Sequence, residues 1–166
     1  RTTEVTVVAG ALDGKRAPPP PPKSWAARAE SDVAIWTLRM QPGATWTLPP
    51  ARPESGRTLY FFRGSSVTVA GERVSERSAI AVRGDIETRL EADGECELLM
   101  LQGKPIGEPA LAYGPFVMND RAGIEQAVRD YQRTQFGGWP WPSDDPVHPR
   151  GEGRFAKHAG GRIERA

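Results

Sequence analysis

The chain has 166 residues, of which 38% are hydrophobic and 26% charged, enough for one globular domain with a buried core. Its formal net charge is +1, and its lysines and arginines are spread along the chain, so composition gives nucleic-acid binding no support. No segment reaches the roughly 20 apolar residues that a membrane-spanning helix needs. The 18 glycines and 16 prolines favour short elements joined by turns over a helical bundle.

The first 103 residues form a series of β-prone runs separated by turn residues. Ala70-Gly71 lies between two such runs and predicts a tight hairpin. Short strands at this regular spacing are typical of an antiparallel sandwich or jelly-roll barrel. The predicted strands cover residues 5–8, 33–40, 44–48, 58–62, 67–69, 73–74, 79–82, 86–90 and 96–101.

Two local features of this region have alternative interpretations. Residues 18–22 are five consecutive prolines, which form an extended segment without backbone donors. A stiff loop packed on its own domain is favoured over a ligand for an SH3-like partner. Cys96 is the only cysteine and lies in an apolar run, which favours a buried side chain over a reactive thiol. The absence of a disulfide and of a signal peptide leads us to expect a cytoplasmic protein.

A helix is predicted over residues 121–134. Ile124, Ala127, Val128 and Tyr131 recur at helical spacing on one face, and Asp120 is a natural N-cap. Gly137-Gly138 is expected to end the helix. Residues 138–166 have almost no periodicity and predict an irregular tail, pinned by its few aromatic side chains.

The barrel pattern can be tested for the metal motifs of cupins. In these motifs a His-x-His pair on one strand points into the barrel, where a glutamate and a third histidine complete the ligand set. The first motif, laid on Gly43, places Pro49 and Ala51 at the two histidine positions. Counting back from Gly64 places Arg57 at the glutamate, and the second motif places Val82 at the third histidine. We therefore expect neither a metal site nor a catalytic residue in this chain.

Residues 101–137 carry a longer pattern, LQGKPIGEPALAYGPFVMNDRAGIEQAVRDYQRTQFG. This pattern resembles the C-terminal signature of the pirin family, whose members contain two cupin barrels in tandem. The resemblance extends over about residues 3–137, and Gly123 departs from it, since relatives usually carry Glu there. Seven residues are expected to have interdomain or structural roles: Glu108, Pro109, Gly114, Pro115, Phe116, Met118 and Asn119. Glu108 is expected either to pair with an arginine or to stay solvated.

The resemblance implies an all-β chain: a cupin-type antiparallel barrel or jelly roll with one C-terminal helix and an irregular tail. A degenerate, metal-free barrel would cover residues 1–103, the signature segment and helix 104–137, and the tail 138–166. We expect this chain to be part of a longer polypeptide. In the family, the N-terminal cupin domain binds iron or another divalent metal through three histidines and a glutamate. That domain is the expected partner, and a further protein partner is also considered.

Two functions from different classes follow from the resemblance. In the first, the chain is the metal-free half of a pirin-like protein and supports an N-terminal iron-binding barrel. The whole protein would then act as a quercetin 2,3-dioxygenase or as an iron- and redox-dependent regulator. In the second, the chain is a standalone cupin-like module that binds a small molecule or a protein. The presence of a His-x-His barrel upstream of this sequence would discriminate between them.

Overall fold

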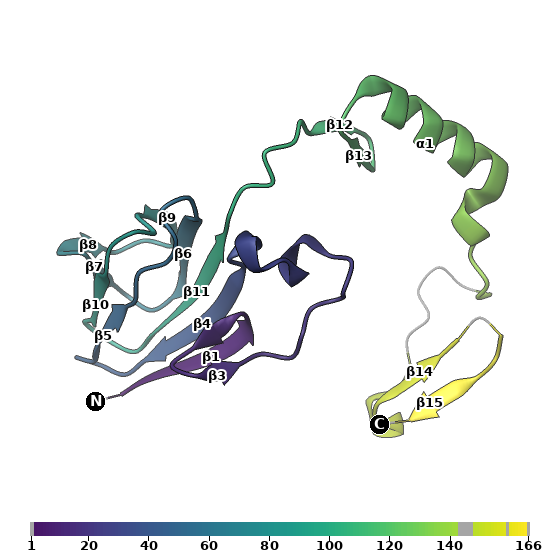
Figure 1. The fold of residues 1–166 in the computed structure, drawn as a ribbon. Helices are drawn as coiled ribbons and strands as arrows, with labels where there is room; N and C mark the ends of the chain where they lie inside the picture. Colours follow the sequence, from purple (N-terminus) through teal and green to yellow (C-terminus); the bar gives the residue numbers. More distant parts are fainter. Residues whose placement is uncertain (1, 143–147, 159, 166) are drawn as a thin grey trace. The chain divides into compact units, whose positions relative to one another are not determined.

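The computed structural model describes residues 2–142, 148–158 and 160–165 (Figure 1). The chain divides into two compact units, Arg1–Gly107 and Glu108–Ala166. The first unit consists of strands with two short 3-10 turns, and the second contains two hairpins, one α-helix and two 3-10 turns. In the part of the chain that is described, no helix has the length and apolar character needed to cross a membrane.

The first unit contains two antiparallel sheets. One has the strand order β1-β4-β11-β6-β9 and the other β5-β10-β7-β8, so most spatial neighbours are distant in sequence, as in a jelly roll. The two sheets face each other across a shared core without closing into one continuous barrel. This confirms the predicted all-β architecture. The strands are β1 (Thr3–Ala9), β4 (Ala34–Met40), β5 (Thr45–Leu48), β6 (Gly56–Arg63), β7 (Val67–Val69), β8 (Glu72–Val74), β9 (Ser78–Val82), β10 (Thr88–Ala92) and β11 (Cys96–Gly103), with a small hairpin of β2 (Ala11–Leu12) and β3 (Lys15–Arg16).

The core of this unit follows from the alternation of side chains along each strand. In β6 the buried positions are Arg57, Leu59 and Phe61, and every second residue between them is more exposed. The same alternation in β4 and β11 brings large apolar groups to the inner face. The hairpin predicted at Ala70-Gly71 is confirmed, since β7 pairs with β8 across these two residues. The fully buried apolar side chains include Leu38, Met40, Leu48, Leu59, Phe61, Val67, Leu90, Leu98 and Met100.

The segment after the five prolines is tied to its own unit. It contains two 3-10 turns, η1 (Trp25–Ala27) and η2 (Ala29–Ser31). The Trp25 indole donates to the Lys104 carbonyl oxygen at 3.2 Å, and the Lys104 amide donates to the Ser31 carbonyl oxygen at 2.7 Å. These bonds fasten the segment to the end of β11.

Cys96 lies at the closest approach between two chain segments. Gly64 has φ +120°, and a side chain there would lie 2.6 Å from the Cys96 Cβ, so this position requires glycine. Cys96 is fully buried, and burial raises the pKa of its thiol to about 11, with smaller contributions from the charges of Asp93 and Glu97. These features fit a buried apolar side chain.

The second unit begins with a hairpin of β12 (Leu111–Tyr113) and β13 (Phe116–Met118), followed by α1 (Arg121–Thr134). Gly114, with φ +54°, starts the two-residue turn that joins the strands. The predicted helix and its cap are confirmed, because the Asp120 Oδ1 accepts a bond from the Gly123 amide at 2.7 Å. The apolar stripe buries Ile124 and Ala127.

The helix ends three residues before the predicted glycine pair. Gln135 and Phe136 both adopt left-handed backbone conformations, and a 3-10 turn, η3 (Gln135–Gly137), follows. This reversal brings the Phe136 ring to 5.3 Å from Tyr131 and 6.2 Å from Phe116, measured between ring centroids. Phe116, Tyr131 and Phe136 therefore form an aromatic cluster at the end of the helix, where Gly137-Gly138 predicted only that the helix ends.

The tail contains regular structure that its lack of periodicity did not predict. A 3-10 turn, η4 (Arg150–Glu152), precedes a hairpin of β14 (Phe155–Lys157) and β15 (Ile163–Arg165). The centroid of the Phe155 ring lies 4.4 Å from that of the His148 ring. The Arg165 guanidinium carbon also lies over the Phe155 ring, 5.7 Å from its centroid. The rings of Trp139 and Trp141 lie 4.7 Å apart. The aromatic side chains therefore contact groups within the tail.

The raised thiol pKa predicts a pH-dependent stability. The unfolded chain loses the Cys96 proton near pH 8.5, whereas the folded chain keeps it until about pH 11. The contribution is fully present below pH 8.5 and is lost as pH rises toward 11. In urea titrations, the stability of the wild type relative to Cys96→Ala should therefore fall by roughly 2 kcal/mol between pH 8 and pH 10.5. A difference that stays constant with pH would contradict the expectation.

The N-cap bond predicts a local effect on α1. Asp120→Ala removes the acceptor for the Gly123 amide and should destabilise the helix by about 1 kcal/mol. Amide hydrogen exchange in the first turn of α1 should accelerate, while exchange in β6 and β11 stays unchanged. Asp120→Asn keeps an acceptor and serves as the matched control. Equal exchange in the alanine and asparagine variants would show that the cap contributes nothing.

Candidate functional site

The four positions at which metal ligands would stand in a cupin motif centre on Arg57. Along the inner face of the five-stranded sheet, Arg57 is paired with Val82 of β9 on one side and Gln102 of β11 on the other. Gln102 is in turn paired with Ala34 of β4. These residues form one row at one end of the sheet, next to the row that contains Leu59.

The Arg57 side chain is 4% exposed and is held on two sides. Its Nη1 donates to the Pro49 carbonyl oxygen at 2.7 Å, and its Nε donates to the Gln102 Oε1 at 2.9 Å. Nη2 also donates to the Gln102 Oε1. Burial lowers the pKa of Arg57, and the Asp32 charge opposes this change. Because a guanidinium in proteins does not deprotonate, the row carries a fixed positive charge.

Asp32 supplies the nearby negative charge without touching the guanidinium. Its Oδ2 accepts bonds from the Ser55 hydroxyl at 2.6 Å and from the Arg52 amide at 3.2 Å. The Asp32 carbonyl oxygen accepts from the Gln102 Nε2 at 3.0 Å. Gln102 therefore links Arg57 to the Asp32 backbone, and the network connects the starts of β4 and β6 with the ends of β5 and β11.

The structure brings together three of the four predicted positions. Arg57 binds the Pro49 carbonyl and lies opposite Val82, whereas the Ala51 amide donates to the Gly84 carbonyl at 2.6 Å. Proline, alanine and valine side chains have no metal-binding atom, and a guanidinium has only donors. The residues at these positions therefore do not fit a divalent metal.

Gln102, Asp32 and Ser55 belong to the same network but were not identified from the sequence. The alternation of β11, continued beyond Met100, would have placed Gln102 on the inner face. Asp32 carries no comparable signal, since it lies in a loop with a left-handed backbone conformation, φ 48°. Among residues 2–142, 148–158 and 160–165, no group of three or more His, Cys, Asp and Glu side chains could hold a metal ion.

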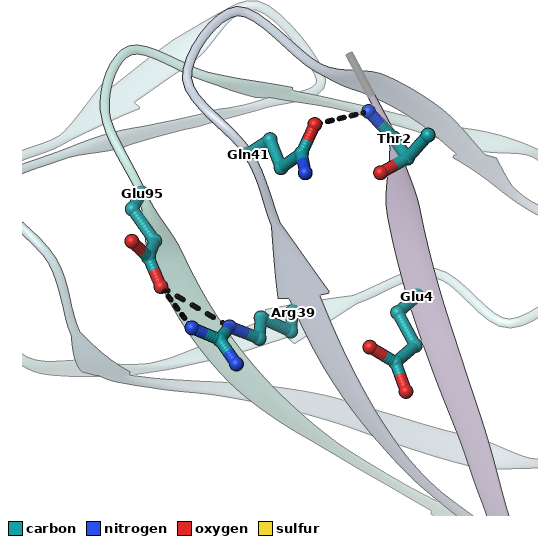
Figure 2. A pocket seen from close by; sticks show the side chains of 5 residues that line it. All are labelled: Thr2, Glu4, Arg39, Gln41 and Glu95. Carbon is teal, nitrogen blue, oxygen red and sulfur yellow. Dashed lines mark hydrogen bonds and ion pairs between the residues drawn. The ribbon is translucent and has the colours of Figure 1, made fainter.

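A second polar region lies on the solvent side of the same sheet, in a hollow of about 290 Å³ (Figure 2). The Arg39 Nη2 and Nε both donate to the Glu95 Oε1, at 2.6 and 3.1 Å. The hydrogen bond from Arg39, followed by its charge, lowers the pKa of Glu95. Thr2 and Gln41 are joined by a hydrogen bond beside this pair, and Glu4 completes the lining. An exposed carboxylate stabilised in its ionised form is poorly suited to act as a general acid.

The signature residues lie in the hairpin of the second unit or directly before and after it. Of the two alternatives for Glu108, pairing with an arginine or solvation, the structure shows an exposed carboxylate that accepts a bond from the Asn119 Nδ2 at 2.7 Å. This bond joins the two flanks of the hairpin. Gly114 and Pro115 form its turn, and Pro109 is exposed ahead of it.

The apolar signature residues face α1. The Phe116 ring lies 6.3 Å from the ring of Tyr131. Met118 lies against Gly123, whose missing side chain would stand 3.1 Å from the Met118 Cβ. A side chain at position 123, such as the glutamate expected from the family resemblance, would therefore require Met118 to shift.

Comparison with known proteins identifies the family. The model of the pirin C-terminal cupin domain matches residues 35–137. A Pseudomonas aeruginosa protein named a "putative quercetin 2,3-dioxygenase" is 35% identical over 134 residues, which is 78% of this chain and 45% of the relative. A pirin-like protein of Caulobacter vibrioides is 38% identical over 106 residues, 63% of this chain and 36% of the relative.

A solved structure has the same fold. The crystal structure of a quercetin 2,3-dioxygenase from Acinetobacter baumannii superposes with a TM-score of 0.68 at 29% identity and covers 82% of this chain and 44% of that one. The chain thus spans less than half the length of these relatives. Together, the matched domain, the two-sheet fold and the hairpin-helix segment show that this chain belongs to the pirin family and contains its C-terminal cupin domain.

Proposed function

We propose that this chain is the metal-free, non-catalytic cupin half of a pirin-type protein, and that it supports an N-terminal cupin barrel, called here the first barrel, that holds the metal. The single observation that carries the proposal is the buried Arg57 guanidinium at the position of the expected glutamate ligand. A fixed cation there replaces the anion that a metal site would need.

The electrostatic cost of placing a metal beside Arg57 supports this assignment. Two unit charges 4 Å apart interact by roughly 4 kcal/mol at the effective dielectric of protein interiors, so a divalent ion would be repelled by about 8 kcal/mol. The guanidinium is also fixed by Pro49 and Gln102, so it cannot swing away without leaving buried acceptors unpaired. The position is therefore chemically hostile to a divalent cation.

The alternative of a standalone small-molecule binder has less support. The space between the sheets is filled by fully buried side chains, among them Phe61, Leu38 and Met100. A ligand would have to displace these side chains, and changes of volume in a close-packed core destabilise the folded state. The names of the relatives point to quercetin 2,3-dioxygenase chemistry for the whole protein, and we assign that chemistry to the first barrel. A cytoplasmic location is part of this proposal and accords with the one unpaired cysteine.

Metal content tests the proposal directly. The purified, untagged chain, incubated with ferrous iron under nitrogen and desalted, should hold no stoichiometric iron by elemental analysis. The full-length Pseudomonas aeruginosa relative, treated in parallel, serves as the positive control and should hold about one metal ion. About one iron atom per molecule of this chain would overturn the proposal.

The Arg57 network predicts a large effect on stability. Arg57→Leu leaves the Pro49 carbonyl oxygen and the Gln102 side-chain oxygen Oε1 without their buried donor. It also leaves the Asp32 carboxylate without its nearby positive charge. We expect a loss of about 2–4 kcal/mol in the free energy of unfolding, measured by urea titration. The matched control is Arg52→Leu, which removes an exposed guanidinium from the adjoining loop and should cost less than about 0.5 kcal/mol. Equal losses in the two variants would contradict a structural role for Arg57.

A further inference from the structure

A groove of about 620 Å³ runs between β12 and α1 in the second unit. We call it the β12–α1 groove. All three residues of β12 line one wall, and one stripe of α1 lines the other. The lining residues are Leu111, Ala112 and Tyr113 from the strand and Arg121, Ile124, Glu125, Val128 and Arg129 from the helix.

The helix covers the two strands of the hairpin unequally. Side chains on one face of the hairpin point toward α1, and on β13 they are in contact with it, through Phe116 with Tyr131 and Met118 with Gly123. On β12 the same face carries Leu111 and Tyr113, which are 42% and 68% exposed. Half of the apolar face of the hairpin is therefore open, next to the helix stripe that contains Ile124 and Val128.

The edge of β12 that borders the groove also has free backbone groups. Tyr113 and Phe116 flank a two-residue turn, so they form the hydrogen-bonded pair of the hairpin. The next pair, Ala112 with Val117, is then a non-hydrogen-bonded pair, whose amide and carbonyl groups point outward to the two edges. Within the described residues, no hydrogen bond involves the Ala112 backbone. An unpaired strand edge beside an apolar wall is the arrangement that accepts an added strand.

We infer that the β12–α1 groove accepts an extended segment as a third strand along β12, and that this segment belongs to the first barrel. The inference rests on the proposed function, since it specifies how the two halves make contact. The Ala112 amide and carbonyl would bind the backbone of the segment, and its inward side chains would cover Leu111, Tyr113 and the half-buried Val128. The geometry asks for apolar residues at alternate positions of the segment.

The charges at the groove specify the chemistry further. Arg121 is already paired with Glu125, at 3.2 Å. Arg129 donates only to the neutral Gln126 Oε1, at 2.9 Å, and has no carboxylate within ion-pair distance among the described residues. An acidic side chain on the incoming strand would provide its counter-ion. A second copy of this chain would instead bring another Arg121 and Arg129 to the same groove, which favours the first barrel as occupant.

The small size of the hairpin-helix segment also favours the first barrel as the source of the strand that fills the β12–α1 groove. A two-stranded hairpin is marginally stable in water, and three strands against a helix form a stable layer. The relatives are more than twice as long as their matched parts, so each has a further half from which a strand can come. A strand-rich cupin barrel is a natural source of such a segment.

The test is a chimera in which this chain replaces the matching C-terminal part of the Pseudomonas aeruginosa relative. Joining the two halves keeps their effective concentration high. Amide hydrogen exchange at Ala112 and along α1 is compared between the chimera and the isolated 166-residue chain. Protection should rise at least about tenfold in the chimera. Unchanged exchange at Ala112 in the chimera would overturn the inference.

Two proline variants of the chimera locate the added strand. Ala112→Pro removes the amide at the β12 edge, and Val117→Pro removes the equivalent amide at the opposite edge of the same hairpin. Ala112→Pro should return α1 to the exchange rates of the isolated chain, whereas Val117→Pro and the conservative Ala112→Val should keep the protection. Loss of protection in all three variants, or in none, would overturn the inference.

The failure of this inference is distinguishable from failure of the proposed function. A compact chimera with about one iron atom, in which Ala112 exchanges as fast as in the isolated chain, leaves the supporting role intact and removes only the strand contact. A chimera whose halves separate after limited proteolysis overturns both. Protection of Ala112 in the isolated chain that increases with protein concentration assigns the groove to a second copy and overturns the choice of occupant.

Discussion

The first unit depends on the way in which one buried positive charge is satisfied. Arg57 lies on the inner face of β6, in line with Leu59 and Phe61, where alternation would place an apolar side chain. A charge in that position is tolerated only if its donors and its countercharge are provided locally. Pro49 and Gln102 provide the acceptors and Asp32 provides the charge. Each comes from a different segment, so satisfying Arg57 fixes how those segments meet.

This network would also allow a cupin without a metal ion to keep a stable fold, as the proposed function requires. A metal ion in a cupin joins strands by drawing their ligands to one point. In this chain the Arg57 network joins β6, β11 and the end of β5 by hydrogen bonds, with the cation supplied by the protein itself. The rest of the core is apolar and close-packed and needs no central ion. Under the proposed function, this hydrogen-bond network would take the place of a metal ion in holding the strands together.

The sequence predicted the elements that have strong periodicity and missed those that depend on tertiary contacts. The nine strand positions in the first unit and the helix at 121–134 follow from alternation, helical spacing and the Asp120 cap. Ile86 was assigned to a strand, but β10 begins at Thr88, because the preceding residues turn after Gly84 and leave Ile86 46% exposed. The short pairs β2–β3, β12–β13 and β14–β15 contain two or three residues per strand, too few to produce a detectable period.

The candidate site was likewise predicted only in part, because some of its residues are brought together only by tertiary contacts. The motif count predicted four replaced ligand positions, and the structure brings three of them, Pro49, Arg57 and Val82, close together while Ala51 bonds to Gly84. It could not find Gln102 or Asp32, since neither belongs to a metal motif and Asp32 approaches through a loop. For Glu108 the sequence left open an arginine partner or solvation, and it could not identify Asn119, because only the hairpin brings the Asn119 side-chain amide to 2.7 Å from the carboxylate.

The second unit has the opposite character to the first. The first unit fills its own core with apolar side chains, while the second unit leaves Leu111, Tyr113 and the outer edge of β12 exposed within the described residues. Evolution rarely keeps such groups together without a use, because exposed edges and apolar patches promote aggregation. If the proposed function holds, the filled core of the first unit would provide a rigid scaffold, and the open groove of the second unit would provide the surface that contacts a neighbouring barrel.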